Sequence, residues 1–316
     1  MYTSGGLMAP RIDALLGAAF VVTWSSGFIG ADLGARSAPA SSLLAWRFII
    51  AFAFLGAWTL LRRRRIPLRE LALHITIGVL GQVGYLYGVF AAVDQGVPAG
   101  TTALICALQP IVAVTLAVPL LGESVTTRQM AGFALGILGV ALVVGADLGA
   151  NPGVPFLAYA LPIGAMLSLV AATLFERRTR PRLALTDALT VQAGVSAAIF
   201  TTLAAATNTL TPPAAPRFWI AIAVLVLVAM LGGYGLYWIN LARSGVARVS
   251  ALLYLTPPAT MAWSWLAFGA ALAPLSLLGV LICAAAVLMI HRRPTPPTAP
   301  PVAPHPQRHP DTTPAN

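Results

Sequence analysis

Polar and aromatic side chains recur inside the long apolar stretches of this sequence. Gln82 and Tyr85 are three residues apart, and Trp24 directly precedes Ser25. Because residues three or four apart share one face of a helix, such helices can present polar and aromatic groups to a common cavity. The alternative is that tyrosine and tryptophan anchor helices at a membrane surface. We predict a substrate-binding cavity lined by Trp24, Ser25, Arg47, Gln82, Tyr85, Gln109, Tyr234 and Tyr254.

Arg47 is the one charge that falls well inside an apolar stretch, roughly 10 Å along a helix from its outer end. A cation at that depth costs on the order of 3 kcal/mol unless it has a partner. Asp32, one turn from the end of the first apolar stretch, is the candidate. We predict that Arg47 and Asp32 pair at the outer mouth of the cavity and contact an anionic group of the substrate.

Catalysis inside a membrane would need a nucleophile with a base, a cluster of metal ligands or paired acids. Cys106 and Cys283 lack metal-ligand spacing, and we interpret both as small packing residues. We therefore predict no enzyme activity, no metal site and no cofactor. The histidines are His74 and His291 at the ends of apolar stretches and His305 and His309 in the tail, with no pair at depth.

The composition is that of a membrane protein. Hydrophobic residues make up 58% of the chain and charged residues 9%, against about 45–50% and 25% in soluble domains. The net charge of +10 could suggest nucleic acid. However, the basic residues are scattered between apolar stretches and form no continuous soluble face, so we expect a lipid bilayer around the chain and no nucleic-acid partner.

The distribution of arginine predicts the topology, because the chain has no lysine. With ten spans and a cytoplasmic N-terminus, 16 of the 19 arginines lie on the inner side, as the positive-inside rule expects. Both termini are then cytoplasmic. The predicted spans are 12–33, 40–61, 71–93, 98–119, 128–146, 154–175, 186–206, 217–240, 246–268 and 272–291.

Residues 96–144 recur in altered form at residues 245–290. Aligning Gly122 with Gly269 also places Pro110 on Pro257, which indicates an internal duplication. Five spans per half is an odd number, so the halves must enter the membrane in opposite orientations. The predicted organisation is a short N-terminal segment 1–11, five-helix repeats 12–146 and 154–291, and a disordered proline-rich tail 292–316.

The motif residues resemble the repeated domain of the EamA-type drug/metabolite transporters. They are Leu108-Gln109-Pro110, Leu120-Leu121-Gly122-Glu123, Gly132 and Gly139-Val140, with Leu255-Thr256-Pro257 and Gly279 in the second copy. Ala270 stands where Glu123 is expected to recur. The resemblance implies an all-α integral membrane fold of two inverted repeats. It also implies a secondary transporter that exports or exchanges a small metabolite, such as an amino acid or an amphipathic drug-like compound. A lipid-carrier flippase is the alternative.

Three further expectations follow for such a transporter. Pro110, Pro257 and Pro258 interrupt spans four and nine and are hinge candidates, because a proline leaves a carbonyl one turn back unpaired. Asp32 is the carboxylate placed to couple transport to protons, and otherwise the transport is facilitated diffusion or exchange. Glycines at helical spacing in spans three and five favour close helix contacts, which act as a sliding seam, as static packing or as the contact of a homodimer.

Overall fold

The computed structural model of the chain describes residues 5–62, 66–109, 111–113, 115–116, 127–253, 255–269 and 274–291. All regular secondary structure in these residues is helical, which confirms the all-α prediction. Seven helical segments of this part of the chain are long and apolar enough to cross a membrane. Two shorter apolar helices, Ala99–Ala113 and Pro274–Ala286, accompany them. Pro110, Tyr254 and the tail 292–316 lie outside the described residues.

Helix boundaries follow the prolines of the sequence. Pro39, Pro67 and Pro98 directly precede α2, α3 and α5, because proline lacks the N–H needed to continue the previous element and favours the start of a new one. The helices are α1 Gly5–Ala35, α2 Ala40–Leu61, α3 Leu68–Gly78, η1 Val79–Gly84, α4 Tyr85–Asp94, α5 Ala99–Cys106, α7 Thr127–Ala150, η2 Phe156–Tyr159, α8 Ala160–Thr179, α9 Leu185–Ala206, α10 Pro216–Ala223, η3 Val224–Gly232, α11 Gly233–Leu253, α12 Thr256–Phe268 and α13 Pro274–His291.

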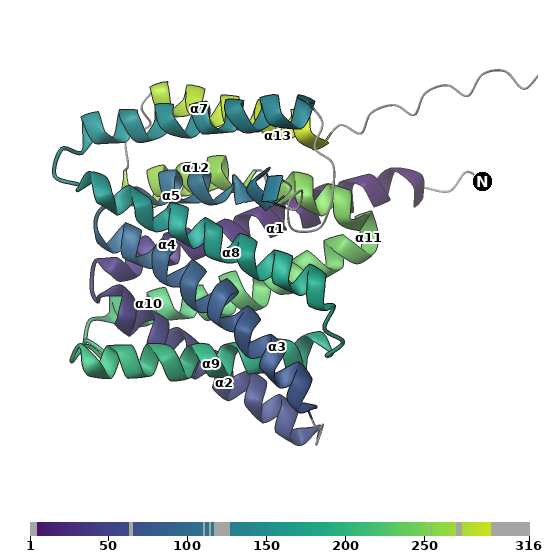
Figure 1. Ribbon diagram of the computed structural model, residues 1–316, viewed down its shortest axis with the longest axis vertical. Helices are drawn as coiled ribbons and strands as arrows, with labels where there is room; N and C mark the ends of the chain where they lie inside the picture. Colours follow the sequence, from purple (N-terminus) through teal and green to yellow (C-terminus); the bar gives the residue numbers. More distant parts are fainter. Residues whose placement is uncertain are drawn as a thin grey trace, which may run out of the picture.

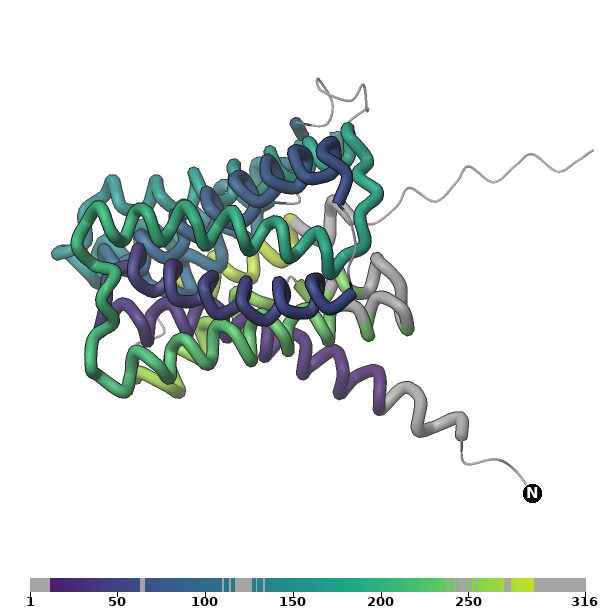
Figure 2. The backbone as a smooth tube through the Cα atoms, turned by 90° about the horizontal axis from the view of Figure 1, so that it is seen from below, coloured from purple at the N-terminus to yellow at the C-terminus, as the bar shows by residue number. Residues whose placement is uncertain are grey.

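The helices form one bundle in which the halves of the chain pack against each other (Figure 1). Helix α2 packs on α9, α5 on α12 and α7 on α13. Helix α1 packs on η3 and α11, and α4 packs on α8. Figure 2 shows α2 and α9 running side by side along one face. The contacts between the halves are therefore symmetric. The first helix of the first half, α1, packs on η3 and α11 of the second half, and the first long helix of the second half, α8, packs on α4 of the first half.

The two halves repeat their departures from a regular α-helix. The π-helical segment η1 contains Gln82, and the π-helical segment η3 contains Ala229. The alignment that matches Gly122 with Gly269 gives these two residues equivalent positions in the two halves. The same alignment relates two breaks in the helical chain, one after α5 and one before α12. The first break lies at Ala107 and Leu108, directly after α5, and the second lies at Leu255, directly before α12. Such irregular turns are frequent at functional sites.

The structure confirms one prediction about helix breaks and contradicts another. The chain is interrupted beside Pro257 and Pro258 as predicted, and both prolines occupy the first turn of α12, where a proline has no hydrogen bond to remove. The turn expected between spans eight and nine, at residues 241–245, is helical, because α11 continues to Leu253. That segment carries one glycine and no proline, and a single glycine costs a helix only about 1 kcal/mol.

Glycines allow the closest approach between the halves. A Cβ on Gly139 of α7 would lie 2.8 Å from the carbonyl oxygen of Gly279 on α13 and 2.6 Å from Cys283 Sγ. Within the first half, a Cβ on Gly136 would lie 3.1 Å from the Leu108 side chain and 3.3 Å from that of Ile111. Gly136 and Gly139 of α7 therefore serve contacts inside the molecule, and Cys283 packs against Gly139 as predicted.

Candidate functional site

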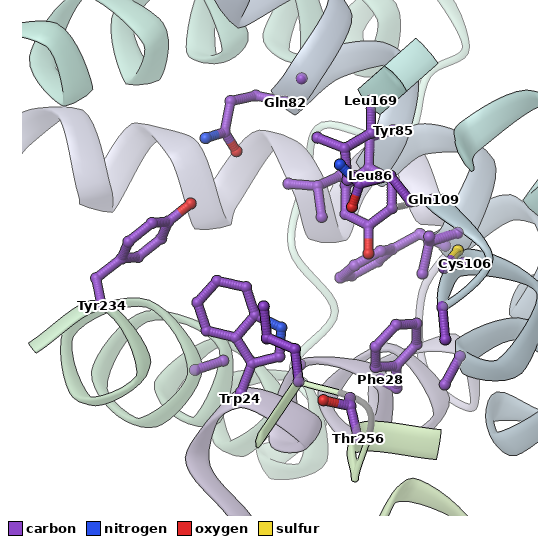
Figure 3. Close-up of a pocket in the computed structure, with 18 of the residues that line it drawn as sticks. Trp24, Phe28, Gln82, Tyr85, Leu86, Cys106, Gln109, Leu169, Tyr234 and Thr256 are labelled. Atoms are coloured by element: carbon purple, nitrogen blue, oxygen red, sulfur yellow. The ribbon is translucent and has the colours of Figure 1, made fainter. Parts of the chain in front are cut away.

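A cavity of about 330 Å³ lies between the two halves of the bundle (Figure 3). The first half contributes residues from α1, α2, η1, α4 and α5, and the second half contributes residues from α8, η3, α11 and α12. The lining residues are Trp24, Gly27, Phe28, Arg47, Gly81, Gln82, Tyr85, Leu86, Val89, Phe90, Ala103, Cys106, Ala107, Gln109, Leu169, Ala229, Tyr234, Leu253 and Thr256.

Arg47 places a buried positive charge at this cavity. Its side chain is 8% exposed, and Nε has no hydrogen-bond partner among the described residues. The guanidinium carbon lies 5.6 Å from the Phe48 ring centre and 5.9 Å from that of Phe90, close enough for weak cation–π attraction. No carboxylate of the described chain forms an ion pair with Arg47. The cavity therefore offers a desolvated cation with unused donors, which suits a carboxylate or another anionic group.

Aromatic rings form one wall of the cavity. Trp24 on α1 and Tyr234 on α11 make an edge-to-face contact with ring centres 5.6 Å apart. Phe20 lies behind Trp24, at a distance of 5.4 Å between ring centres. Figure 3 shows Trp24, Tyr85 and Tyr234 around the same space. Such a wall can contact the apolar part of a ligand and, through ring faces, a cationic group.

Two glutamines supply neutral polar groups. Gln109 Nε2 donates to Thr173 Oγ1 on α8 at 3.3 Å, and Gln82 Nε2 donates to Gln192 Oε1 on α9 at 3.5 Å. Each amide therefore has a partner on the second half of the chain. Each also keeps hydrogen-bonding capacity for a ligand, because an amide has two donors and two acceptor lone pairs.

The cavity brings together six of the eight residues predicted to line it: Trp24, Arg47, Gln82, Tyr85, Gln109 and Tyr234. Ser25 is buried and is not among the residues that line this cavity, and its hydroxyl donates to the carbonyl of Val22 at 3.1 Å. Tyr254 lies outside the described residues.

The predicted pairing of Arg47 with Asp32 is also wrong. Asp32 instead pairs with Arg36, four residues on and directly after the end of α1, with Oδ1 3.2 Å from Nε. Residues four apart on one helix meet without any tertiary arrangement, whereas Arg47 lies on a different helix. Asp32 is not among the residues that line the cavity.

Sequence reasoning missed the apolar lining and Thr256. Phe28, Val89 and Phe90 look like ordinary lipid-facing or core residues in a hydrophobic stretch, so no local signal distinguishes them. The sequence did contain a signal for Thr256, because the alignment of the two halves gives it the position equivalent to Gln109, a predicted cavity residue. Cys106, interpreted as a packing residue, also lines the cavity, and its Sγ lies 4.0 Å from the Pro162 carbonyl oxygen on α8.

The duplication and the shared cavity agree with a comparison to known families. The profile of the EamA-like transporter family matches residues 11–145 and again residues 156–292. The chain belongs to the EamA-like transporter family. It is therefore a multi-pass membrane transporter for a small molecule, and the two matched segments are its repeats.

Relatives along most of the chain are transporters as well. A probable terminal-alkyne amino-acid exporter of Streptantibioticus cattleyicolor is 29% identical over 279 residues, which cover 86% of this chain and 91% of the relative. A probable amino-acid metabolite efflux pump of Escherichia coli strain K12 is 27% identical over 283 residues, with 86% and 92% covered. A solved crystal structure shares the fold with a TM-score of 0.59 at 21% identity, covering 89% of this chain and 99% of its own.

Proposed function

We propose that this transporter exports an amino acid with an apolar side chain from the cytoplasm. The observation that carries the proposal is the buried, unpaired Arg47 guanidinium in a cavity walled by apolar and aromatic residues. The names of the two relatives, an amino-acid exporter and an amino-acid metabolite efflux pump, support the same cargo class. The cavity of about 330 Å³ is at the small end of ligand sites, which range over about 300–1,000 Å³.

In this proposal the cargo is held at both of its charges. Arg47 binds the carboxylate, because a guanidinium matches that group with two parallel hydrogen bonds. The Gln82 carbonyl and the aromatic rings around it receive the ammonium group. Phe28, Val89 and Leu169 then surround the apolar side chain.

The proposed mechanism is alternating access between two inverted five-helix repeats that together span the membrane ten times, with both termini in the cytoplasm. The symmetric exchange of helix contacts between the halves supports a twofold relation between them. The repeated breaks beside Gln109 and Thr256 supply candidate hinges, with Pro110, Pro257 and Pro258 next to them. Residues from both repeats surround the cavity, which favours a walled solute site over the lateral slot of a lipid carrier.

The test is binding of labelled L-leucine to the purified protein, compared with leucinamide, which lacks the carboxylate. Arg47→Gln should weaken leucine binding by about 10-fold to 100-fold, because a hydrogen bond to a charged group contributes about 1.5–3 kcal/mol. Leucinamide binding should change little. Arg36→Gln is the matched control, since Arg36 is half exposed and pairs with Asp32.

Equal losses for leucine and leucinamide in Arg47→Gln would show that Arg47 does not recognise the carboxylate. Absence of binding for every amino acid in the wild-type protein would overturn the cargo class itself. Thermal melting of Arg47→Gln and Arg47→Lys separates a folding defect from a binding defect, since Lys keeps the charge without the planar fork.

A further inference from the structure

A file of polar side chains leads from one end of the bundle to the cavity. Glu70 and His74 lie one turn apart on α3, and Gln82 lies two turns beyond His74, in η1. Gln192 of α9 bridges the last two: its Nε2 lies 3.4 Å from His74 Nδ1, and its Oε1 lies 3.5 Å from Gln82 Nε2. The file therefore joins a buried titratable ring to an amide that lines the cavity.

Gly78 makes this bridge geometrically feasible. It lies on the same helical face as His74 and Gln82, halfway between them. A Cβ at Gly78 would lie 3.0 Å from Gln192 Cα and 2.8 Å from Val195 Cγ1. Helix α9 thus packs so closely here that one glutamine side chain reaches both neighbours.

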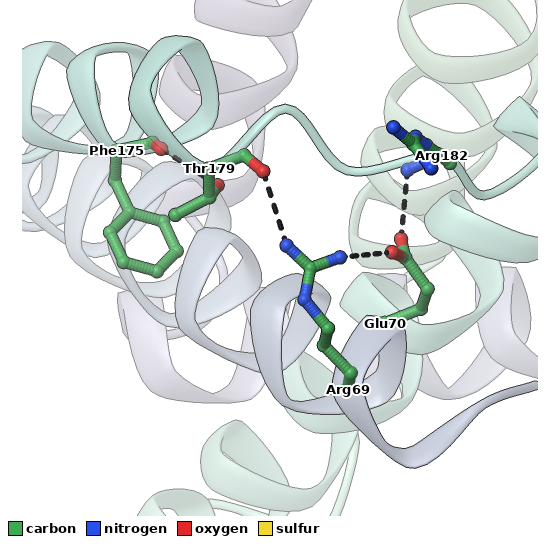
Figure 4. Close-up of polar contacts among 5 residues, drawn as sticks. All are labelled: Arg69, Glu70, Phe175, Thr179 and Arg182. Carbon is green, nitrogen blue, oxygen red and sulfur yellow. Dashed lines mark hydrogen bonds and ion pairs between the residues drawn. The ribbon is translucent and has the colours of Figure 1, made fainter.

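The end of the file near Glu70 is accessible and highly charged. Glu70 Oε1 pairs with Arg69 at 3.0 Å, and Oε2 accepts the backbone N–H of Arg182 at 2.9 Å (Figure 4). Arg69, Arg182 and Asp187 of α9 line an open recess beside Glu70. The charged groups that act on His74 are Glu70 on its own helix and Glu176 on α8.

The direction of the hydrogen bonds in the file depends on the proton of His74. An amide nitrogen only donates, so Gln192 Nε2 requires Nδ1 of a neutral ring as acceptor, with the ring proton on Nε2. The His74 side chain is 3% exposed, and Nε2 has no hydrogen-bond partner among the described residues. Gln192 Oε1 then accepts from Gln82, which leaves the Gln82 carbonyl oxygen for the cavity.

Protonation of His74 reverses the direction of these hydrogen bonds. Both ring nitrogens of a charged histidine donate, so Gln192 must turn its oxygen to Nδ1 and its nitrogen to Gln82. Gln82 must then turn in the same way and offer N–H groups to the cavity. An ammonium group that the Gln82 carbonyl had accepted would now face donors.

We propose that His74 is a proton-binding site that controls, through Gln192 and Gln82, whether the cavity accepts the cationic group of the cargo. The inference rests on the proposed amino-acid cargo for the identity of that group. A proton at His74 and an ammonium at Gln82 exclude each other, which is the property an exchanger of protons for cargo needs. The site is distinct from Asp32, the carboxylate that sequence reasoning assigned to coupling.

The first test is labelled L-leucine binding to the purified full chain between about pH 5 and pH 8, where a histidine can change charge and leucine stays zwitterionic. Wild-type affinity should fall at least about fivefold from the higher to the lower pH, the lower bound of typical coupling between two sites. His74→Gln and Gln192→Leu should show a flat profile. His291→Asn, a control at the last residue of α13, should keep the wild-type profile. A flat wild-type profile, or a Gln192→Leu profile like wild type, would overturn the relay.

The second test needs no cargo and so separates this inference from the proposed function. Infrared difference spectra of the cargo-free protein between the same two pH values should contain both histidine ring bands and glutamine carbonyl bands. Gln192→Leu should keep the ring bands and lose the carbonyl bands, even if His74→Gln fails to fold. Ring bands without glutamine bands in the wild type would overturn the relay whether or not leucine binds.

Discussion

The contact between Gly139 and Gly279 allows a prediction with a worked magnitude. In Gly139→Ala the new Cβ would lie 2.6 Å from Cys283 Sγ, 2.8 Å from the Gly279 carbonyl oxygen and 3.1 Å from the Cys283 backbone nitrogen. A side chain can rotate away, but the two backbone atoms can move only if α7 and α13 separate. Overpacking of this kind costs about 1–3 kcal/mol, and alanine returns about 0.5–1 kcal/mol of helix propensity. The expected net loss is about 1–2 kcal/mol.

Thermal melting of the purified protein measures this loss. A change of 1 kcal/mol shifts Tm by about 2–4 °C for domains of roughly this size, so Gly139→Ala should lower Tm by about 2–8 °C. Gly145→Ala is the matched control on the same helix, because a Cβ there meets nothing within 4 Å. It should leave Tm unchanged or raise it slightly. The reasoning fails if both variants shift Tm equally, or if Cys283→Ala fully restores the Tm of Gly139→Ala, since the backbone contacts would remain.

Three further predictions concern other polar contacts. Glu70→Ala should lower stability by about 1–3 kcal/mol in a chemical-denaturation or melting assay, because it leaves the Arg182 backbone N–H without its acceptor. Arg69→Ala removes an ion-pair partner that is two-thirds exposed and should cost under about 1 kcal/mol. Equal losses of stability in the two variants would contradict this ranking. Asn240→Leu should cost about 0.6–1.7 kcal/mol, because the Asn240 amide ties α11 to the Leu16 carbonyl of α1 at 3.1 Å; a melting curve like wild type would refute that tie. Asp32→Asn should leave the pH dependence of leucine binding intact, since Asp32 pairs with Arg36 outside the cavity; loss of that dependence would return the coupling role to Asp32.

The cavity residues show how far periodicity alone can reach. Gln82 and Tyr85, three residues apart, do face the same cavity, because one turn of helix holds them on one side whatever surrounds it. Ser25 is a polar residue inside an apolar stretch and directly follows Trp24, but adjacent residues of a helix point in directions about a quarter turn or more apart. Its hydroxyl is satisfied within α1.

The prolines illustrate a different limit. A proline in an apolar stretch predicts an interrupted helix, and the chain is interrupted near Pro257 as expected. Whether the result is a kink or a new helix start depends on how the two segments pack. The contact of α12 with α5 of the other half, through Gly100 and Met261, belongs to that packing and has no local sequence signal.

The sequence by itself determined the helical membrane fold, the repeat and the position of Arg47 inside a long apolar helix, because these depend on the length of apolar stretches and on spacing along one helix. Only the tertiary structure decided which partners the polar groups take. Gln192 of α9 lies between His74 and Gln82 of the first half, in a close helix contact that Gly78 allows. Such choices depend on the rotation and relative depth of helices more than a hundred residues apart in the chain, and no local pattern encodes those two quantities.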